Sequence, residues 1–343
     1  MSSREYLSEL YSITMYYMKC FLGQSGMRLH LVVLSSLALI SPLCRLSADP
    51  ISQINQLVVF GDSLSDDGNA YIASGGAFPG PNYAVGRYTD GPNTTPKTTG
   101  PFGLWEEQLA GDVGLADPQP FLAGGTTYAV ASAETGSNGK FDVTDQLNYF
   151  KVAHPGGAPN GALYTIWAGA NDIFDGKNPV TAADNLFANI QTLHSEGAKY
   201  FLWLNLPPLG DTPYGYSHGL VNGLNTLTTE FNNEWSVDLG KLQSSGIQVV
   251  GVNIGILFNQ IAADPSVYGF TDIKDSARGL AGVNPNDYLF WDDVHPTTAA
   301  DALVADLALH DFVATPEPAT FGLIGLCGLL LAGFRMRRKN VSC

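Results

Sequence analysis

Residues 56–69 read Gln-Leu-Val-Val-Phe-Gly-Asp-Ser-Leu-Ser-Asp-Asp-Gly-Asn. The run 56–60 is largely apolar and β-branched and ends at Gly61, which predicts a strand buried on both faces of a parallel sheet. Ser63 follows at the tip of this strand. In open α/β folds, ligands bind at the carboxyl edge of the sheet, where helix N-terminal amides favour negative charge. The sequence therefore predicts a reactive hydroxyl at that edge.

Similar apolar runs recur along the chain and predict further strands at residues 163–168, 200–206 and 247–252, with a short fifth strand at 288–291. Apolar residues at helical spacing predict helices at about 183–193, 226–243 and 300–307. Strands that alternate with helices are typical of a layered α/β fold with a parallel sheet. Residues 75–103 are rich in Gly, Pro and Thr and are expected to form a long surface loop, either a substrate lid or an ordinary connection.

The charge of the chain excludes one large class of partner. Of the 343 residues, 32 are acidic and 17 are basic, for a formal net charge of −15. Eight of the basic residues and three of the acidic ones lie in residues 1–48 and 316–343, so residues 49–315 carry 29 acidic and 9 basic residues, a net charge of −20. A phosphate-binding surface needs clustered Lys and Arg, so nucleic acid is not an expected partner.

The cysteines are also confined to the ends of the chain, at positions 20, 44, 327 and 343. Residues 49–315 therefore form no disulfide and no Cys-ligated zinc site. The acidic run at residues 62–67 is interrupted by Leu64 and lacks the alternating oxygen ligands of a calcium loop. We expect neither a metal nor another cofactor.

A base for the Ser63 hydroxyl is available in Asp292-Asp293-Val294-His295-Pro296. Asp292 and His295 are three residues apart, so one turn can place the carboxylate against Nδ1 of the imidazole and leave Nε2 facing Ser63. Asn171 follows the second apolar run, in Gly169-Ala170-Asn171-Asp172, and its side-chain amide can donate to an oxyanion. Each piece alone is common, but the three in this order at predicted strand ends indicate a serine hydrolase.

The combination closely resembles the SGNH or GDSL esterase and lipase family. The matching blocks are residues 59–69, 169–172 and 292–296, with lesser matches at 86–92, 205–209 and 268–272. The resemblance spans about residues 55–313 and implies a flavodoxin-like three-layer α/β/α fold with a central parallel sheet. It also implies that Ser63 is the nucleophile, His295 the base and Asp292 the residue that orients the base. Asn171 and the Ser63 backbone amide become oxyanion donors.

One block departs from the family pattern, which places a Gly at the backbone amide that completes the oxyanion hole. Residues 127–133 read Thr-Tyr-Ala-Val-Ala-Ser-Ala, so Ala131 and Ser132 stand where glycines are expected. A backbone amide of another residue can still donate if its φ is negative, and we expect Ser132 to be this donor.

A second serine competes with Ser63 for the role of nucleophile. Gly215-Tyr216-Ser217-His218-Gly219 matches the Gly-x-Ser-x-Gly elbow, a motif that requires a strand directly before it and a helix directly after it. Here Pro-rich and Gly-rich segments flank it on both sides. Ser63 is therefore the stronger prediction.

Both ends of the chain read as targeting signals. In residues 1–48, a basic start at Met27-Arg28, an apolar run at 31–43 and the small pair Ser47-Ala48 predict a secretory signal peptide, with Met27 as the expected start of translation. A membrane anchor, a buried helix and a lipoprotein modified at Cys44 are the alternatives for this segment.

Residues 314–343 contain Pro316-Glu317-Pro318, an apolar run at 319–334 and a basic cluster at 335–339. This order resembles the PEP-CTERM sorting signal of Gram-negative bacteria, which implies export, transient retention in the inner membrane and removal of the tail by an exosortase. A permanent tail anchor is the alternative.

The sequence thus predicts three segments: an N-terminal extension with a signal peptide (1–48), a hydrolase domain (55–313) and a sorting tail (314–343). The expected function is an exported serine esterase or lipase that hydrolyses carboxylic esters, of small molecules, lipids or acylated glycans, through an acyl-enzyme. Its expected location is the periplasm, the cell surface or the medium. A deacetylase of extracellular polysaccharide is the second hypothesis. A non-catalytic surface or matrix protein is the third.

Overall fold

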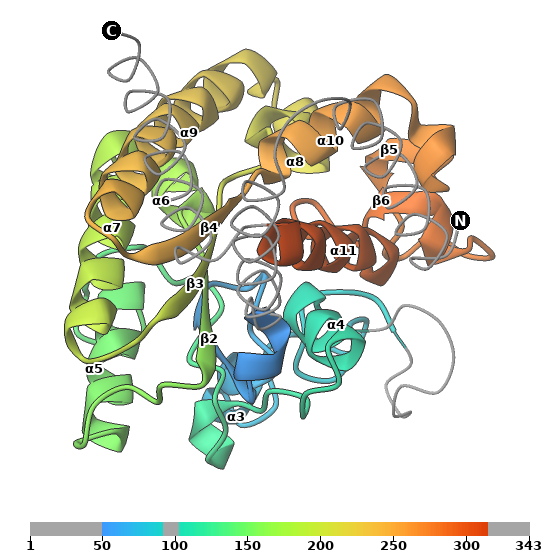
Figure 1. Cartoon of the computed structure of the whole chain (residues 1–343). Coiled ribbons are helices and arrows are strands. Elements are labelled where there is room, and N and C mark those ends of the chain that lie inside the picture. Colours follow the sequence, from blue (N-terminus) through green and yellow to red (C-terminus); the bar gives the residue numbers. More distant parts are fainter. Residues whose placement is uncertain (1–49, 92–102, 315–343) are drawn as a thin grey trace, which may run out of the picture. The chain divides into compact units, whose positions relative to one another are not determined.

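A parallel sheet forms the centre of the protein (Figure 1). The computed structural model describes residues 50–91 and 103–314. Within these ranges, four strands pair in parallel and in chain order: β1 (Gln56–Gly61), β2 (Ala162–Trp167), β3 (Tyr200–Leu204) and β4 (Gln248–Val252). Almost every residue of β1, β2 and β3 is buried, as the apolar runs predicted.

A fifth segment extends the sheet at the free edge of β1. From the sequence, its residues are expected only to belong to the block at 127–133 that completes the oxyanion hole. Residues 126–130 run parallel to β1: Val59 N donates to Thr126 O (3.0 Å), Tyr128 N to Val59 O (2.7 Å) and Val130 N to Gly61 O (3.2 Å). The segment follows β1 in the chain and lies on the side of β1 opposite β2. Across the sheet the order is therefore residues 126–130, β1, β2, β3 and β4. The segment that is second in the chain lies at the edge, beside the first strand, as in flavodoxin-like folds.

Helices cover both faces of the sheet (Figure 1). One layer contains α5 (Val143–Ala153), α7 (Pro179–Ser195) and α9 (Val221–Ser244), and the other contains α4 (Trp105–Asp112) and α11 (Thr298–Ala314). Four more helices each follow a strand of the central sheet: α3 (Asn69–Ala73), α6 (Ala170–Phe174), α8 (Pro213–Ser217) and α10 (Ile254–Ala263). The predicted α/β/α fold is confirmed.

Six of these helices are absent from the sequence predictions: the five-residue helices α3, α6 and α8, and the longer α4, α5 and α10. The reason is clearest for α4, whose buried residues include Glu106, Glu107 and Gln108. A helix that buries carboxyl and amide side chains carries no apolar stripe, so its pattern does not stand out in the sequence.

The predicted fifth strand at residues 288–291 does form, but outside the central sheet. It is β6 (Tyr288–Phe290), which pairs in parallel with β5 (Asp272–Ser276) in a separate two-stranded sheet. The prediction that it continues the series of central strands is therefore wrong. A run of three residues is compatible with any short pairing, and the outer edge of the central sheet is taken by residues 126–130.

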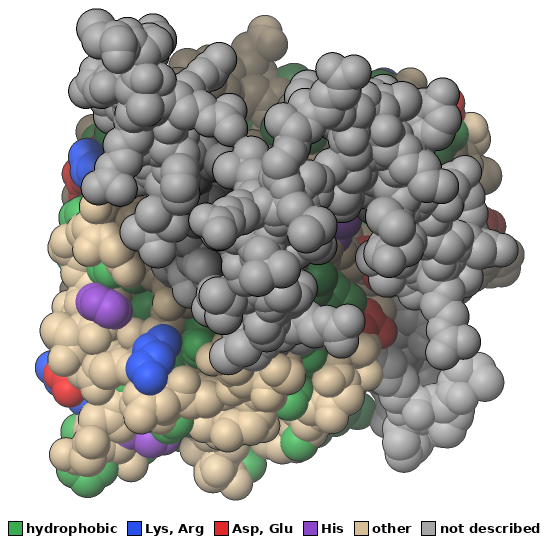
Figure 2. Space-filling model, viewed as in Figure 1, with side chains coloured by type: hydrophobic (Ala, Val, Ile, Leu, Met, Phe, Trp, Pro, Cys, Tyr) green, Lys and Arg blue, Asp and Glu red, His purple; other side chains and the backbone are tan. Residues whose placement is uncertain are grey.

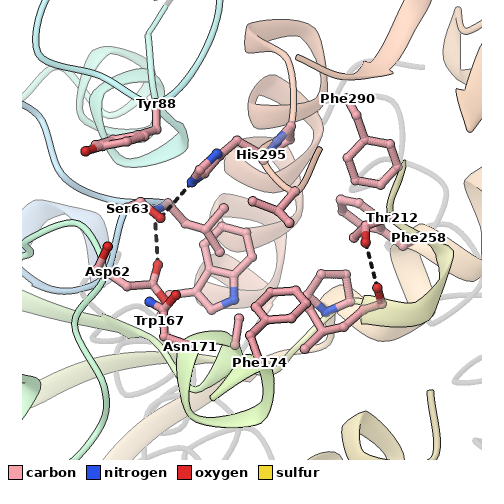
Figure 3. Close-up of a pocket in the computed structure, with 17 residues that line it drawn as sticks. Asp62, Ser63, Tyr88, Trp167, Asn171, Phe174, Thr212, Phe258, Phe290 and His295 are labelled. Carbon is pink, nitrogen blue, oxygen red and sulfur yellow. Dashed lines mark hydrogen bonds between the residues drawn. The ribbon is translucent and has the colours of Figure 1, made fainter. Parts of the chain in front are cut away.

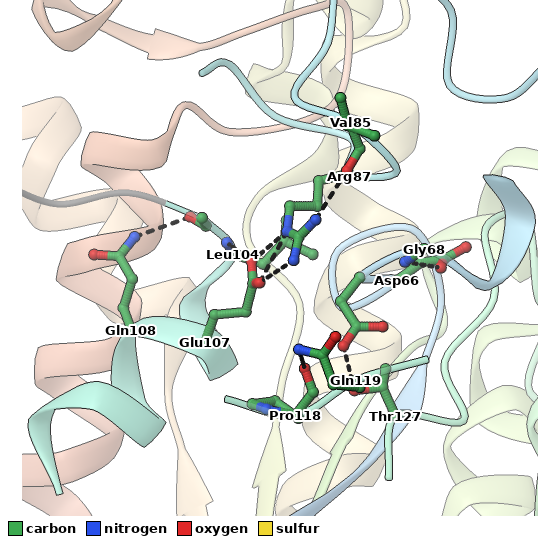
Figure 4. A network of polar contacts seen from close by, with 12 residues as sticks. Asp66, Gly68, Val85, Arg87, Leu104, Glu107, Gln108, Pro118, Gln119 and Thr127 are labelled. Atoms are coloured by element: carbon green, nitrogen blue, oxygen red, sulfur yellow. Dashed lines mark hydrogen bonds and ion pairs between the residues drawn. The ribbon is translucent and has the colours of Figure 1, made fainter. Parts of the chain in front are cut away.

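The predicted loop at residues 75–103 is described as far as Gly91, and residues 75–91 contain no helix or strand. Part of it is not a surface loop, because Ala84, Thr89 and Asp90 are buried. Figure 4 shows how it is held: the Arg87 guanidinium donates to both carboxylate oxygens of Glu107 on α4 and to the Val85 carbonyl. Glu107 Oε2 also accepts from Leu104 N (2.9 Å), so the ion pair ties the loop to the start of α4.

Basic side chains do not cluster on the described part of the surface seen in Figure 2. On the part of the face in Figure 2 that described residues form, Lys and Arg side chains are scattered and form no patch. No helix of residues 50–91 and 103–314 is long and apolar enough to cross a bilayer. The predicted signal peptide and the apolar run of the sorting tail both lie outside the described residues.

Candidate active site

The predicted site residues meet at the carboxyl edge of the sheet (Figure 3). Ser63 lies two residues after β1, Asn171 lies in the first turn of α6 just after β2, and His295 lies on the loop between β6 and α11. All three line the same pocket. The sharp turn after β1 depends on Gly61, because a Cβ there would lie 2.3 Å from the Trp167 carbonyl oxygen of β2. Gln146 of α5 bonds both backbone polar groups of Gly61.

Ser63, His295 and Asp292 form a continuous chain of hydrogen bonds. The distance from Ser63 Oγ to His295 Nε2 is 2.7 Å. The other ring nitrogen, Nδ1, lies 2.7 Å from Asp292 Oδ2 and 2.9 Å from Oδ1. With the proton on Nδ1, His295 donates to the carboxylate and presents an acceptor to the serine hydroxyl. The arrangement has the geometry of a nucleophile, a base and an orienting carboxylate.

Asp292 is held by more partners than His295 alone. Its Oδ1 accepts from the backbone amides of Val294 (2.9 Å) and His295 (2.7 Å), and its Oδ2 accepts from the Tyr83 hydroxyl (2.7 Å). Burial by itself raises the pKa of this carboxyl, but the His295 charge and these hydrogen bonds outweigh it and hold the pKa well below its usual range. In the folded protein, the Asp292 carboxyl is therefore ionised at neutral pH.

The candidate oxyanion donors are the amides of Ser63, Ser132 and Asn171, which all line the pocket. Within the part of the chain that the structure describes, neither the Ser63 nor the Ser132 amide donates a hydrogen bond. The Ala131 amide does, to Asp66 Oδ2 at 2.7 Å, so of the two positions where glycines were expected only Ser132 offers a free N–H. Asn171 Nδ2 donates to Ala133 O at 2.9 Å, which leaves its second N–H unused.

Ser132 adopts φ = 65°, in the left-handed region, and it is the one described residue other than Gly with a positive φ. The expectation of a negative φ at this position is wrong. A serine here carries the backbone conformation that glycine prefers, which costs of order 1–3 kcal/mol unless the surroundings hold it. The neighbouring Ala131–Asp66 bond supplies one such constraint.

Asp62 is a second buried acid beside the site, and the sequence analysis gave it no role. Its Oδ1 accepts from Leu64 N (3.0 Å), which shapes the turn that carries Ser63, while its Oδ2 has no hydrogen-bond partner. Burial raises its pKa to about 7, although the Leu64 bond and the proximity of His295 oppose the shift. A change in the charge of Asp62 would therefore be felt at His295.

The pocket next to Ser63 has a volume of about 240 Å³ and a largely apolar wall. Its apolar lining comes from the segments at the ends of the four central strands and from β6 and the His295 loop: Leu64, Trp167, Ala170, Phe174, Pro207, Leu209, Phe258, Phe290, Val294 and Pro296. Besides the residues already described, its polar lining consists of Tyr88 and Thr212, and the Thr212 hydroxyl already donates to Leu209 O (2.7 Å). The pocket thus suits an apolar group better than a sugar.

The rival serine, Ser217, lies elsewhere. It ends the short helix α8 and is exposed, and its Oγ bonds only near neighbours, Tyr214 O (3.2 Å) and His218 Nδ1 (3.0 Å). It lies in no strand-to-helix turn and does not line the pocket.

Among the described residues, one group of acids lies close enough to bind an ion: Asp184, Glu234 and Asp238. The Lys241 ammonium already pairs with Asp238 (2.7 Å) and Glu234 (3.4 Å) and supplies the positive charge there. These residues belong to α7 and α9 and do not line the Ser63 pocket.

Comparisons with known proteins assign two segments of the chain. The model of the GDSL-like lipase/acylhydrolase family matches residues 57–308, and the PEP-CTERM protein-sorting motif matches residues 314–339. The sorting motif is typical of exported proteins of Gram-negative bacteria. Both resemblances stated from the sequence are confirmed.

Individual relatives are distant. The chain is 26% identical to a phosphatidylcholine-sterol acyltransferase of Aeromonas hydrophila, over 76% of this chain and 91% of that protein. It is 27% identical to a thermolabile hemolysin of Vibrio parahaemolyticus, over 75% of this chain but only 64% of that protein. A solved structure of a member of the lipolytic G-D-S-L family from Veillonella parvula shares 15% identity, covers 76% of this chain and 99% of that chain, and has a TM-score of 0.44.

The family match extends over most of the chain and includes both the strand that leads to Ser63 and the loop that carries His295. The chain therefore belongs to the GDSL-like lipase/acylhydrolase family and is a hydrolase that acts on ester bonds.

Proposed function

We propose that this protein is an exported serine esterase that cleaves carboxylic esters through an acyl-enzyme on Ser63. The single observation that carries the proposal is the hydrogen-bond chain from Ser63 Oγ through His295 to Asp292, at 2.7 Å on each side of the imidazole. This geometry supports one role for each residue: Ser63 is the nucleophile, His295 is the base, and Asp292 is the group that orients the base.

In the first half of the reaction, Ser63 Oγ attacks the ester carbonyl carbon and its proton passes to His295 Nε2. The carbonyl oxygen becomes an oxyanion, and the donors we assign to it are the amides of Ser63 and Ser132 and the second N–H of Asn171, none of which has another partner among the described residues. The intermediate then collapses, the bond to the alcohol oxygen breaks, and the alcohol leaves with the proton from His295. The acyl group remains on Ser63.

In the second half, water gives a proton to His295 as its oxygen attacks the acyl carbon. A second oxyanion forms in the same amide pocket and collapses, which breaks the bond to Ser63 Oγ. His295 returns the proton to Ser63 and the carboxylic acid leaves. Asp292, ionised throughout, stabilises the imidazolium that exists in each half.

The lining of the pocket supports esters with an apolar acyl group. Phe174, Phe258 and Phe290 project from three different elements, α6, α10 and β6, toward the space beside Ser63 (Figure 3). A deacetylase of extracellular polysaccharide needs room only for a methyl group at this position, and its sugar would meet few free polar groups in the pocket. The intact hydrogen-bond chain also argues against a purely structural protein.

We propose further that the two ends of the chain set its location. Residues 27–48 direct export, residues 319–334 hold the chain transiently in the inner membrane, and an exosortase cuts near the Pro316-Glu317-Pro318 motif. The sorting-motif match at residues 314–339 supports this route. The motif follows α11, the last described helix, so a cut there leaves the Ser63 pocket intact.

The nucleophile is tested by replacing each serine separately. Ser63→Ala should lower kcat/KM for p-nitrophenyl butanoate by about 1,000-fold or more, because no other described hydroxyl lies against His295. Ser217→Ala, the matched control, should stay within about twofold of the wild type, since Ser217 is exposed and outside the pocket. Near-normal activity of Ser63→Ala, with folding verified by circular dichroism, would refute the proposed mechanism.

The acyl preference is tested with a series of p-nitrophenyl esters and acetylated xylan. Each methylene buried against the apolar wall is worth roughly 0.8 kcal/mol, about fourfold in kcat/KM. Hexanoate has four more methylenes than acetate, so it should exceed acetate by about tenfold if only two of them are buried and by about 200-fold if all four are. Phe174→Ala should reduce this ratio, whereas Phe78→Ala, at an exposed site that does not line the pocket, should not. Acetylated xylan as the best substrate would instead favour the deacetylase.

The strained Ser132 backbone gives a test of the oxyanion site. Ser132→Gly should keep activity within about threefold and not lower stability, because glycine adopts φ = 65° without a clash. Ser132→Val should lower the free energy of unfolding by about 1–3 kcal/mol and impair kcat, since a β-branched residue is disfavoured at that φ. The two variants are compared by thermal unfolding and by kcat. A valine variant with wild-type values for both would show that the left-handed conformation is not required.

Processing of the tail is tested by mass. The protein isolated from a host that carries an exosortase should end near residue 316, because the cut is expected at the Pro-Glu-Pro motif. Intact-mass spectrometry of this material gives the C-terminus directly. Full-length chain that still contains Cys343 in such a host would contradict processing and leave a membrane-tethered hydrolase.

A further inference from the structure

Residues 83–90 lie against the loop that carries His295. Three hydrogen bonds join them to residues 292–298: Tyr83 OH donates to Asp292 Oδ2 (2.7 Å), Thr89 Oγ1 to Pro296 O (3.1 Å) and Thr298 N to Asp90 Oδ1 (2.7 Å). The partners are more than 200 positions apart in the chain. The 83–90 segment thus contacts the His295 loop at its beginning, its middle and its end.

The 83–90 segment is itself fixed in place. Arg87 pairs with the buried Glu107 of α4 (Figure 4), and Ala84 N donates to Thr89 O (3.0 Å) across the segment. Thr89 is fully buried and Asp90 nearly so. The segment is therefore a rigid support for the residues it presents, although it contains no helix or strand.

The ring of Tyr83 is enclosed on three sides, which fixes the direction of its hydroxyl. It makes edge-to-face contacts with Tyr88 (centroids 5.8 Å apart) and Trp291 (6.4 Å), and the Arg278 guanidinium lies over it at 5.0 Å. Burial and then the bond to Asp292 raise the pKa of Tyr83 above its usual range, so the hydroxyl keeps its proton at any pH of enzymatic interest.

The Tyr83 hydroxyl donates to the carboxylate oxygen that lies closest to the His295 imidazole. Asp292 Oδ2 lies 2.7 Å from both Tyr83 OH and His295 Nδ1. A donor on this oxygen fixes the plane of the carboxylate and takes up part of its negative charge. Less charge remains to stabilise the imidazolium.

We propose that Tyr83 is a positioning residue for the reaction: its hydroxyl orients Asp292 and moderates the electrostatic effect of that carboxylate on His295. The inference rests on the proposed Ser63 mechanism. Tyr83 does not line the pocket, so it acts through Asp292 and not on the substrate. Nothing in the sequence marks this residue, because the contact joins two loops 209 positions apart.

Several other polar or titratable groups lie close to the His295 imidazole. Asp292 lies on the same loop, Ser63 and the buried Asp62 lie after β1, and Tyr88 packs its ring 5.0 Å from the imidazole. The Arg278 guanidinium lies over the ring of Tyr83, 5.0 Å from its centroid. All of these remain when only the Tyr83 oxygen is removed, so a difference in pH dependence between Tyr83→Phe and the wild type reports on the hydroxyl.

The test is Tyr83→Phe, which keeps the ring and its contacts. We expect kcat for p-nitrophenyl butanoate to fall about tenfold while KM stays within about twofold, because the lost hydrogen bond is to a charged group outside the pocket. The acidic limb of the kcat/KM profile should move to higher pH by about half a unit, since the unmoderated carboxylate favours the imidazolium. Tyr149→Phe on α5, an exposed tyrosine outside the pocket, is the matched control and should change neither.

Replacement of Tyr83 by 3-fluorotyrosine provides an opposite test that retains the hydrogen bond. Fluorine makes the phenol a stronger donor, so the acidic limb should move to lower pH. This measurement stands even if the phenylalanine variant folds poorly. Unchanged kcat and pH profiles for both variants would overturn the inference, as would a rise in KM with unchanged kcat. The Ser63→Ala result is independent of these outcomes, so failure of the mechanism and failure of the Tyr83 role are distinguishable.

Discussion

A buried carboxylate, Asp292, is the constraint on which the rest of the site depends. A charge removed from water is costly unless hydrogen-bond donors surround it. Asp292 has four donors: two backbone amides of its own loop, the imidazole and the Tyr83 hydroxyl. Two of them close the loop into a tight turn that points His295 at Ser63. The orientation of His295 is thus a consequence of how the negative charge of Asp292 is accommodated.

The parallel sheet brings the remaining parts to the same place. Each strand that ends at the carboxyl edge is followed by a short turn or helix, and Ser63, Ser132 and Asn171 lie on three such connections. Gly61 permits the sharp exit from β1, where a side chain would collide with the Trp167 carbonyl. Ser63 and Ser132 lie beyond the paired ends of β1 and of residues 126–130, so their backbone amides make no hydrogen bond between strands. Both amides therefore stay free for a ligand.

The acidic character of the protein is compatible with this site because most of the nearby acids have structural partners. Asp66 accepts four backbone amides that shape the turn after Ser63 and the segment at 131, and Glu107 pairs with Arg87. Two acids of the 62–67 run each keep one carboxylate oxygen without a partner: Asp67, whose pKa burial raises to about 8, and Asp62, whose pKa burial raises to about 7. Because Asp62 directly precedes Ser63 in the chain, its titration makes the electrostatic field at the pocket sensitive to pH.

The sequence by itself determined the class of the fold, the family and which residues are the candidates for the active site. Buried parallel strands are continuous apolar runs, and Ser63, Asn171 and the Asp292–His295 pair stand in short local motifs at their ends. Tertiary structure alone decided the outer strand at residues 126–130, the separate pairing of β6, the left-handed backbone of Ser132 and the contact of Tyr83 with Asp292. The physical reason is the range of the interaction. Periodicity and motifs record what a residue does with its near neighbours, whereas strand order, a strained φ and a bond between loops 209 positions apart are fixed only when the whole chain has packed.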